Sequence, residues 1–386
     1  MLLKAAFSGF NMEYAMKTFL NLMEEVLTPR LCHRCGGCVA FCTAINFGAL
    51  EMGEDGRPHF KDKDKCIECG LCYDICPAIQ DLRDETKKRI AWNDPMGRVI
   101  EVTVARAKDP ALWTYARDGG VFTALLLHLF DIGRIDGAVV NKVTAPFICR
   151  PWVATNRQEI IEGGGIHFDA SPGVTLFGEQ YGAYPPYLQL IMPLAKQGLR
   201  RLAFVGRPCQ IETMRRMETL GLVPSEAIKY YLGLFCMGNY RFGETEQAAL
   251  EQIGGFKWEE VRKVNFKEGL QVHLKKGGII VIPLTSLDFM KRQACQYCDD
   301  YSAEFADISV GGLGAMEGWS TVILRTPVGR ALFTDAGNEK LEITNRTKNQ
   351  EIILGSLYKV RDISEKKKKM ARQNREELAG RVKPEK

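Results

Sequence analysis

The order of apolar and polar residues predicts alternating strands and helices over the middle of the chain. Residues 99–106 alternate as a half-buried strand does, and residues 135–140 form a second apolar run of strand length. Between them, Gly119 and Gly120 open an apolar stretch of helical length at residues 121–130. A strand, a loop, a helix and a second strand in this order predict a sheet covered by helices.

The same order of elements recurs further along the chain. A helical stretch from residue 194 leads to an apolar strand at residues 202–205, then to a helix at 210–220 and a strand at 230–235. The predicted fold class over residues 99–350 is therefore α/β, or α+β, with a mixed sheet.

Three other segments differ from this region in their patterns. Residues 1–28 predict an N-terminal extension with an amphipathic helix, because their apolar residues gather late. Residues 83–98 begin with a helix of alternating charge, which is typical of a linker. Residues 351–386 are rich in charge and include a run of lysines at 366–369, so we expect a solvent-exposed helix or a frayed end.

Composition narrows the class of protein. The 386 residues are 46% hydrophobic and 26% charged, as in soluble globular proteins, and no apolar run is long enough to span a membrane. The formal net charge of +5 suits an anionic cofactor or substrate better than nucleic acid, which usually requires a stronger basic stripe. With no secretory signal pattern, the many cysteines predict a reducing, anaerobic cytoplasm, where the protein is free or at the surface of a membrane complex.

Eight of the thirteen cysteines fall into two runs of identical spacing, C-x2-C-x2-C-x3-C. This spacing is typical of a bacterial ferredoxin with two [4Fe–4S] clusters, in which the fourth cysteine of each run binds the other cluster. Zinc ribbons use pairs of cysteines, and a disulfide framework needs an oxidising compartment, so neither suits residues 29–82 as well. The predicted ligand sets are Cys32, Cys35, Cys38 and Cys76 for one cluster, and Cys66, Cys69, Cys72 and Cys42 for the other.

Four further cysteines share a different context. Cys209 and Cys236 each follow a predicted strand, and Cys295 and Cys298 form a C-x2-C pair. Because ligand sites collect at the carboxyl ends of the strands in an α/β sheet, we expect the pair to close over the other two. On spacing alone, four thiolates suit a zinc ion and a third [4Fe–4S] cluster equally, and the neighbouring ferredoxin runs favour iron–sulfur.

Five segments carry a resemblance to a known family: Asp118–Leu126, Gly206–Ile211, Gly233–Met237, Cys295–Tyr301 and Ala306–Gly312. They resemble, in the same order, segments of the beta subunit of coenzyme F420-reducing hydrogenase. The resemblance covers residues 99–330, and with its leading ferredoxin module the chain is most similar in layout to the input subunit of the F420-linked dehydrogenase. It implies a flavoprotein domain that binds FAD and a [4Fe–4S] cluster and exchanges hydride with the deazaflavin coenzyme F420.

The resemblance also implies where the flavin binds. Gly119 and Gly120 would let the backbone approach the flavin or its pyrophosphate, and the N-terminus of the following helix favours an anion. Segment 163–168 lacks the basic residue usual in the family, so His167 is the candidate replacement. No catalytic side chain is expected, because the flavin itself carries the hydride. The candidate cofactor-binding residues are Asp118, Gly119, Gly120, Val121, Thr123, Ser171, Arg207 and His167.

The predicted function is hydride transfer between reduced coenzyme F420 and FAD, with single electrons passing through three [4Fe–4S] clusters to or from a partner complex. The candidate partners are the F420-linked dehydrogenase, formate dehydrogenase, heterodisulfide reductase and sulfite reductase. Two alternatives stay open: a flavin reductase of a nicotinamide or organic substrate, and a cluster-only electron-transfer subunit. The sequence has no G-x-G-x-x-G segment, which argues against a nicotinamide site of the Rossmann type.

Overall fold

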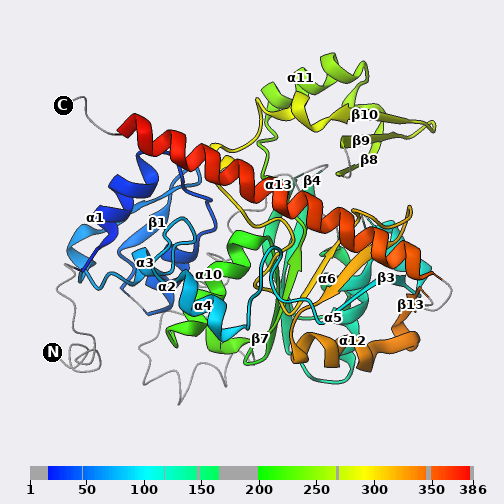
Figure 1. Cartoon of the computed structure of the whole chain (residues 1–386), viewed down its shortest axis with the longest axis horizontal. Coiled ribbons are helices and arrows are strands. Elements are labelled where there is room, and N and C mark those ends of the chain that lie inside the picture. Colours follow the sequence, from blue (N-terminus) through cyan, green and yellow to red (C-terminus); the bar gives the residue numbers. More distant parts are fainter. Residues whose placement is uncertain are drawn as a thin grey trace.

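In the part of the chain that the structure describes, a mixed sheet of eight strands forms the centre of the larger region (Figure 1). The computed structural model describes residues 16–45, 47–116, 118–145, 148–164, 199–266, 269–344 and 349–382. The strands are β3 (Glu101–Ala107), β4 (Gly137–Ala145), β5 (Ile148–Ala154), β6 (Leu202–Gly206), β7 (Ile228–Leu234), β11 (Ile308–Gly311), β12 (Ser320–Leu324) and β13 (Leu341–Ile343). Their order is β13-β3-β12-β11-β7-β6-β4-β5.

The strand directions place several loops at one edge of the sheet. β4, β6, β7 and β11 run parallel to one another. β12 is antiparallel to both β11 and β3, so β3 points the same way as the parallel strands. The loops after β3, β6, β7 and β11 therefore share the carboxyl edge of the sheet, where α/β proteins bind ligands. The predicted mixed α/β sheet is confirmed.

Each face of the sheet has its own hydrophobic core, because side chains alternate along the strands. On β12, Val322 belongs to one core and Ile323 to the other. The first face is covered by α5 (Val121–Asp131) and α12 (Pro327–Lys340), with α6 (Arg157–Glu162) beside α5. The second face carries α10 (Pro208–Thr219), the N-terminal module and α13 (Gln350–Val382).

The N-terminal module consists of two similar halves. In each half a cysteine loop ends at a glycine with positive φ, Gly36 at 79° and Gly70 at 75°, and that glycine begins a short helix. Only glycine adopts this conformation without strain, so it turns the cysteine loop into the helix. The elements are α1 (Phe19–Leu22), the π-helix η2 (Met23–Leu27), α2 (Gly37–Ala44), β1 (Leu50–Met52), β2 (Pro58–Phe60), η3 (Lys63–Lys65) and α3 (Leu71–Asp74).

A small unit projects from the second half of the larger region, at the upper right of Figure 1. It has a three-stranded antiparallel sheet and a hydrophobic core of its own, which includes Leu250, Val272 and Leu287. Its elements are α11 (Glu244–Gly254), β8 (Val261–Phe266), β9 (Gly269–Leu274) and β10 (Ile279–Pro283). The remaining 3-10 turns of the described residues are η4 (Pro110–Thr114), η5 (Ser225–Ala227), η6 (Trp258–Glu260), η7 (Leu284–Leu287) and η8 (Gln293–Gln296).

Two segments are more closely packed than their charge patterns predict. The segment expected as a linker contains α4 (Arg83–Arg89), whose Arg83 and Thr86 are buried. The segment expected as a solvated tail is α13, which runs from beside β13 toward the N-terminal module (Figure 1). Its buried side chains recur every three or four residues and so form one face of the helix: Ile353, Ser356, Val360, Ser364, Lys367 and Ala371. None of the helices in the described ranges is long and apolar enough to cross a membrane.

Candidate iron–sulfur and cofactor site

The structure brings together the four residues of the first predicted cysteine set. Cys32 and Cys35 lie in the loop before α2, Cys38 lies in its first turn, and Cys76 follows α3. Burial raises the pKa of the Cys32 thiol to about 11, and the Cys35 thiol adds to this effect. Burial and the thiols of Cys35 and Cys32 likewise raise the pKa values of Cys38 and Cys76. Such thiols ionise when a metal replaces their protons.

The second predicted set also converges. Burial raises the pKa of the Cys72 thiol to about 12, and the thiols of Cys69, Cys66 and Cys42 contribute to this shift. Burial raises the pKa of Cys42 as well, although backbone N–H groups, that of Ala49 among them, donate hydrogen bonds that oppose the shift. Hydrogen bonds of this kind stabilise a thiolate and would do the same for a cluster ligand.

The third set is assembled from three separate segments. Cys209 lies in the first turn of α10 after β6, Cys236 follows β7, and Cys295 and Cys298 lie on η8 and just beyond it. Burial is the largest cause of the raised pKa of Cys209, and the thiols of the other three members add to it. Burial raises the pKa of Cys298 to about 12. The backbone N–H of Asn239 donates a hydrogen bond to Cys295 Sγ at 3.1 Å.

The donor chemistry of all three sets fits iron–sulfur clusters. The twelve thiols are free, and soft thiolate ligands suit iron–sulfur centres. Across the described ranges, no group of three His, Cys, Asp or Glu side chains is arranged to hold a metal ion. A [4Fe–4S] cluster makes a different demand, because each cysteine binds its own iron atom rather than a shared ion.

The first and third sets lie side by side. Cys35 Sγ is 3.5 Å from Thr213 Oγ1, and the same hydroxyl donates a hydrogen bond to the Cys209 carbonyl at 2.8 Å. A Cβ at Gly37 would overlap the methyl group of Thr213, so α2 approaches α10 as closely as glycine allows. The thiol of Cys72 in the second set is close enough to contribute to the raised pKa of Cys38. The three sets therefore follow the order third, first, second.

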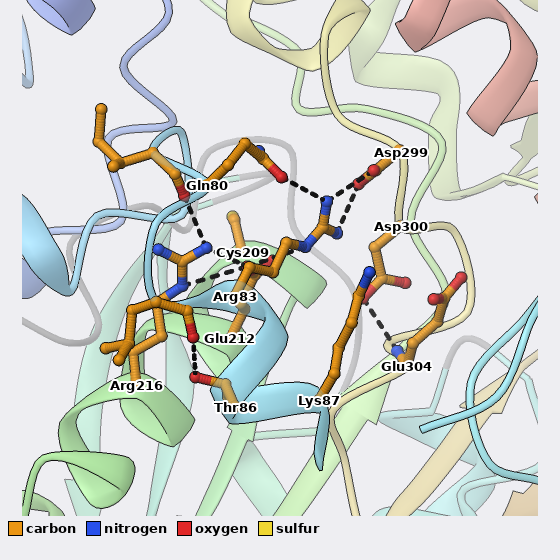
Figure 2. A network of polar contacts seen from close by, with 12 residues as sticks. Gln80, Arg83, Thr86, Lys87, Cys209, Glu212, Arg216, Asp299, Asp300 and Glu304 are labelled. Atoms are coloured by element: carbon orange, nitrogen blue, oxygen red, sulfur yellow. Dashed lines mark hydrogen bonds and ion pairs between the residues drawn. The ribbon is translucent and has the colours of Figure 1, made fainter. Parts of the chain in front are cut away.

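Two buried arginines join the N-terminal module to the third set (Figure 2). Arg83 donates to both carboxylate oxygens of Asp299 at 2.6 and 2.7 Å, and its Nε lies 3.3 Å from Glu212 on α10. Asp299 directly follows Cys298, so the ion pair holds the C-x2-C loop against α4. Burial disfavours the charged carboxylate of Asp299, yet Arg83 outweighs this and lowers its pKa below the usual range.

Arg216, one turn after Glu212 on α10, contacts the end of the second cysteine run. Its side chain is fully buried. The guanidinium donates to the carbonyls of Asp74, Cys76 and Ile79 at 3.2, 2.8 and 2.8 Å, and to Glu212 Oε1 at 2.7 Å. One side chain of the larger region thus satisfies three carbonyls beside a predicted cluster ligand.

The candidate flavin segment follows β3 and lies at the same edge of the sheet as the third set. Asp118 Oδ1 accepts a hydrogen bond from Asn265 Nδ2 at 3.0 Å, and its carboxylate fills the place where Gly312, after β11, has no side chain. The buried Tyr301, whose backbone carbonyl accepts a hydrogen bond from the Cys236 N–H at 2.8 Å, lies beside the third set. Burial raises the pKa of its hydroxyl, and the charges of Cys236 and Asp118 add to the shift.

The two glycines of the segment are required by the packing of the chain itself. Gly120 has φ of +69° and caps α5, and a Cβ there would lie 3.3 Å from that of Ala116 and 3.4 Å from that of Ala107. A Cβ at Gly119 would meet the Ala105 carbonyl oxygen at 2.8 Å. Packing within the chain is enough to explain why both residues are glycine. Contact between these glycines and a flavin therefore stays a prediction.

The other candidate cofactor residues have varied surroundings. Val121 is 1% exposed and its side chain belongs to the core, so only its backbone is available to a ligand. Thr123 is buried in the first turn of α5, with its hydroxyl near Gly164. Arg207 is the N-cap of α10, two residues before Cys209. His167 and Ser171 lie outside the described residues.

Family models match three parts of the chain. Residues 24–77 match a 4Fe-4S dicluster domain. Residues 102–177 and 199–349 match the N-terminal and C-terminal parts of the coenzyme F420 hydrogenase/dehydrogenase beta subunit. The chain belongs to this family.

Named relatives and a solved structure agree with this assignment. The beta subunit of coenzyme F420 hydrogenase from Methanosarcina barkeri is 29% identical, over 63% of this chain and 81% of that protein. One subunit of the F(420)H(2) dehydrogenase from Methanosarcina mazei is 27% identical, over 88% of this chain and 91% of that protein. A chain of the F420-reducing [NiFe] hydrogenase complex from Methanosarcina barkeri has a TM-score of 0.65 and 25% identity, over 74% of this chain and 94% of that chain.

Helix α13 begins where the match to the C-terminal family model ends, at residue 349. It nevertheless contacts the C-x2-C loop of the third set. Asn374 Nδ2 donates to the Gln296 carbonyl at 2.8 Å, and Arg375 Nη2 donates to the Tyr297 carbonyl at 2.7 Å. In this F420 hydrogenase/dehydrogenase family member, the third set is therefore enclosed by a helix outside the matched ranges.

Proposed function

We propose that the chain transfers electrons between coenzyme F420 and a redox partner. A bound FAD would exchange hydride with coenzyme F420 and pass single electrons to iron–sulfur clusters, which accept one electron at a time. The convergence of the third cysteine set beside the first carries the proposal, because it gives an unbroken series of sites from the carboxyl edge of the sheet to the N-terminal module. The names and functions of the relatives support it.

Each cysteine set has a place in this series. We assign Cys209, Cys236, Cys295 and Cys298 to the cluster nearest the flavin, since Cys209 and Cys236 share the carboxyl edge of the sheet with the loop after β3. The first set follows and the second set comes last. Ile67, beside Cys66, is 53% exposed, so the second set reaches the surface where a partner subunit would take up or deliver electrons. In the relatives such partners belong to hydrogenase and dehydrogenase complexes.

The remaining residues would bind and orient the flavin. The N-terminus of α5 carries backbone N–H groups without partners inside the helix, which favour a phosphate, with Asp118, Gly119, Gly120, Val121 and Thr123 around it. Arg207 would offset negative charge next to Cys209, and the hydroxyl of Ser171 and the ring of His167 are the further proposed contacts.

Metal and flavin content of anaerobically purified protein test the proposal. We expect about twelve iron atoms per chain, from three four-iron clusters, and one FAD. Reduced coenzyme F420 should drive dye reduction, and NADH should not. A content near eight iron atoms with one zinc would contradict the third cluster. Absence of FAD would instead support a cluster-only electron-transfer subunit. Activity with NADH but not with reduced coenzyme F420 would support a nicotinamide as the two-electron carrier.

The order of the sites is tested by two cysteine variants. Cys69→Ser damages the last set, so reduced coenzyme F420 should still bleach the flavin while electron delivery to the partner falls. Cys298→Ser damages the set nearest the flavin. With reduced coenzyme F420 as the electron donor, the clusters of the N-terminal module should then stay oxidised, whereas dithionite should still reduce them directly. Loss of flavin bleaching in a folded Cys69→Ser variant would show that the order is wrong.

A further inference from the structure

Helix α13 places a buried lysine against the third cysteine set. Lys367 is 5% exposed, and its Nζ donates to the carbonyl of Cys236 at 2.6 Å and to that of Asp300 at 2.8 Å. Cys236 is a member of the set, and Asp300 is two residues beyond another member, Cys298. The ammonium therefore bridges two of the three segments from which the site is built.

The neighbours of Lys367 on the same helix are paired differently. Lys366 is exposed and forms an ion pair with Asp362 one turn earlier, and Lys368 forms one with the buried Glu304 at 3.0 Å. The hydrogen bonds described for Lys367 go to neutral carbonyls instead. Burial opposes the charge of Lys367, while the nearby thiols of Cys298, Cys236 and Cys295, and after them the carboxylate of Asp300, raise its pKa.

Burial of an ammonium group is costly unless a negative charge compensates it. An iron–sulfur cluster held by four thiolates has such a charge, and its negative charge grows by one unit when it accepts an electron. A fixed cation nearby stabilises the reduced form more than the oxidised form, because the attraction increases with the charge of the cluster. No proton needs to move in this step: the lysine stays charged and one electron enters the cluster.

We propose that Lys367 is the counter-charge of a third iron–sulfur cluster and raises its reduction potential, so that electrons arriving from the flavin are held at this site. The inference rests on the proposed function, since it requires a [4Fe–4S] cluster rather than zinc on the third set. Helix α13, which lies outside the ranges matched by the family models, would then help to position the cluster.

Potentials measured on the intact, anaerobic holoprotein test this inference. Lys367→Met keeps most of the side-chain length and removes the charge, Lys367→Arg keeps the charge, and Lys366→Met is the control with the same loss of charge at an exposed position. A dithionite titration followed by electron paramagnetic resonance reports each cluster. In Lys367→Met we expect the equilibrium constant for reduction of the third cluster to fall at least tenfold, equivalent to about 59 mV for one electron. The potentials of the other two clusters should be unchanged, and both control variants should resemble wild type.

Each other outcome decides the question as well. If Lys367→Met loses four iron atoms while Lys367→Arg keeps them, the positive charge is required to hold the cluster, which supports the proposal. If both lose iron, or if Lys367→Met shifts the potential no more than Lys366→Met, Lys367 has only a packing role. Should Lys367→Met fail to fold, Lys367→Gln retains a donor for the two carbonyls and is held to the same criteria. Zinc in place of the third cluster in wild-type protein would contradict the proposed function itself, and the metal content separates that failure from the failure of the lysine.

Discussion

Twelve of the thirteen cysteines of this protein fall into sets that are organised in two ways. In the N-terminal module, eight of them lie within residues 32–76 and their positions follow from loop spacing and two glycine-initiated helices. In the third set, four thiols come from segments up to 89 residues apart, between Cys209 and Cys298. Here the sheet edge, α10 and α13 position the thiols. A local motif holds its own site together, whereas an assembled site depends on every tertiary contact around it.

The contacts between the two regions should therefore matter more to the third set than to the module. Arg216 on α10 binds carbonyls of the module, and Arg83 on α4 binds both Gln80 of the module and Asp299 beside the third set. Helix α2 also touches α10 at Gly37. Four substitutions test this difference between the regions.

The largest effect is expected for Arg216→Met. The substitution leaves three buried carbonyls, those of Asp74, Cys76 and Ile79, without their donor and removes one of the two arginine partners of Glu212, the other being Arg83. Breaking a buried ion pair on one side costs roughly 3–5 kcal/mol of the free energy of unfolding. Guanidinium unfolding of the anaerobic holoprotein, followed by circular dichroism, measures the loss. Lys88→Met, at an exposed position on α4, is the control and should change little; equal losses in both variants would contradict the assigned role.

The sequence could predict the local site and the sheet, but not these contacts. Cysteine spacing predicts the ligand sets of the module, and apolar periodicity identifies β3, α5, β6, α10 and β7 within a few residues. Nothing in the local pattern of Arg83 or Arg216 distinguishes a buried arginine from a solvated one. Lys367 stands in a run of four lysines, and only its spacing from Val360, Ser364 and Ala371, a helical face of buried residues, signals its position. The strand pattern also did not reveal that α11 and β8–β10 form a separate unit with a hydrophobic core of its own.

A smaller and pH-dependent effect is expected for Arg83→Met. In wild type the folded-state pKa of Asp299 is lowered, so its contribution to stability is present above the unfolded value near 3.8 and is lost only as pH falls through the folded value. Without Arg83, burial raises the pKa of Asp299 against the weaker opposing charges of Arg375 and Lys368. We expect a loss of about 2 kcal/mol at pH 7.

The difference between wild type and Arg83→Met should narrow as the pH falls from 7 toward 5, because protonation relieves the buried carboxylate in the variant while wild type stays paired. Melting temperatures of the holoprotein at several pH values measure this difference. The double variant Arg83→Met, Asp299→Asn should lose the pH dependence. If the difference in melting temperature between wild type and Arg83→Met grows as the pH falls, a titrating group other than Asp299 controls the pH dependence.

A third prediction concerns the contact between the helices of the first and third sets. Gly37→Ala adds a methyl group that would overlap the Thr213 methyl, and overpacking of this kind costs roughly 1–3 kcal/mol. Thr213→Ser removes the obstructing methyl and keeps the hydroxyl beside Cys35. The double variant should therefore recover most of the loss, which a double-mutant cycle on the free energy of unfolding reports as coupling. Additive effects of the two substitutions would show that α2 and α10 do not press against each other there.

The smallest effect on stability, and the sharpest on the cofactor, is expected for Gly120→Ala. Gly120 and Gly133 both have positive φ, +69° and +67°, and flank α5 at its two ends. Alanine at either position should cost about 1 kcal/mol, because the left-handed region disfavours a side chain. A Cβ at Gly133 meets nothing within 4 Å, whereas one at Gly120 presses on Ala116 and Ala107 and displaces the N-terminal turn of α5. If that turn binds the flavin, Gly120→Ala should lose FAD while keeping its iron, and Gly133→Ala should keep both. Equal FAD content in the two folded variants would leave Gly120 as a turn residue only and remove the start of α5 from the flavin site.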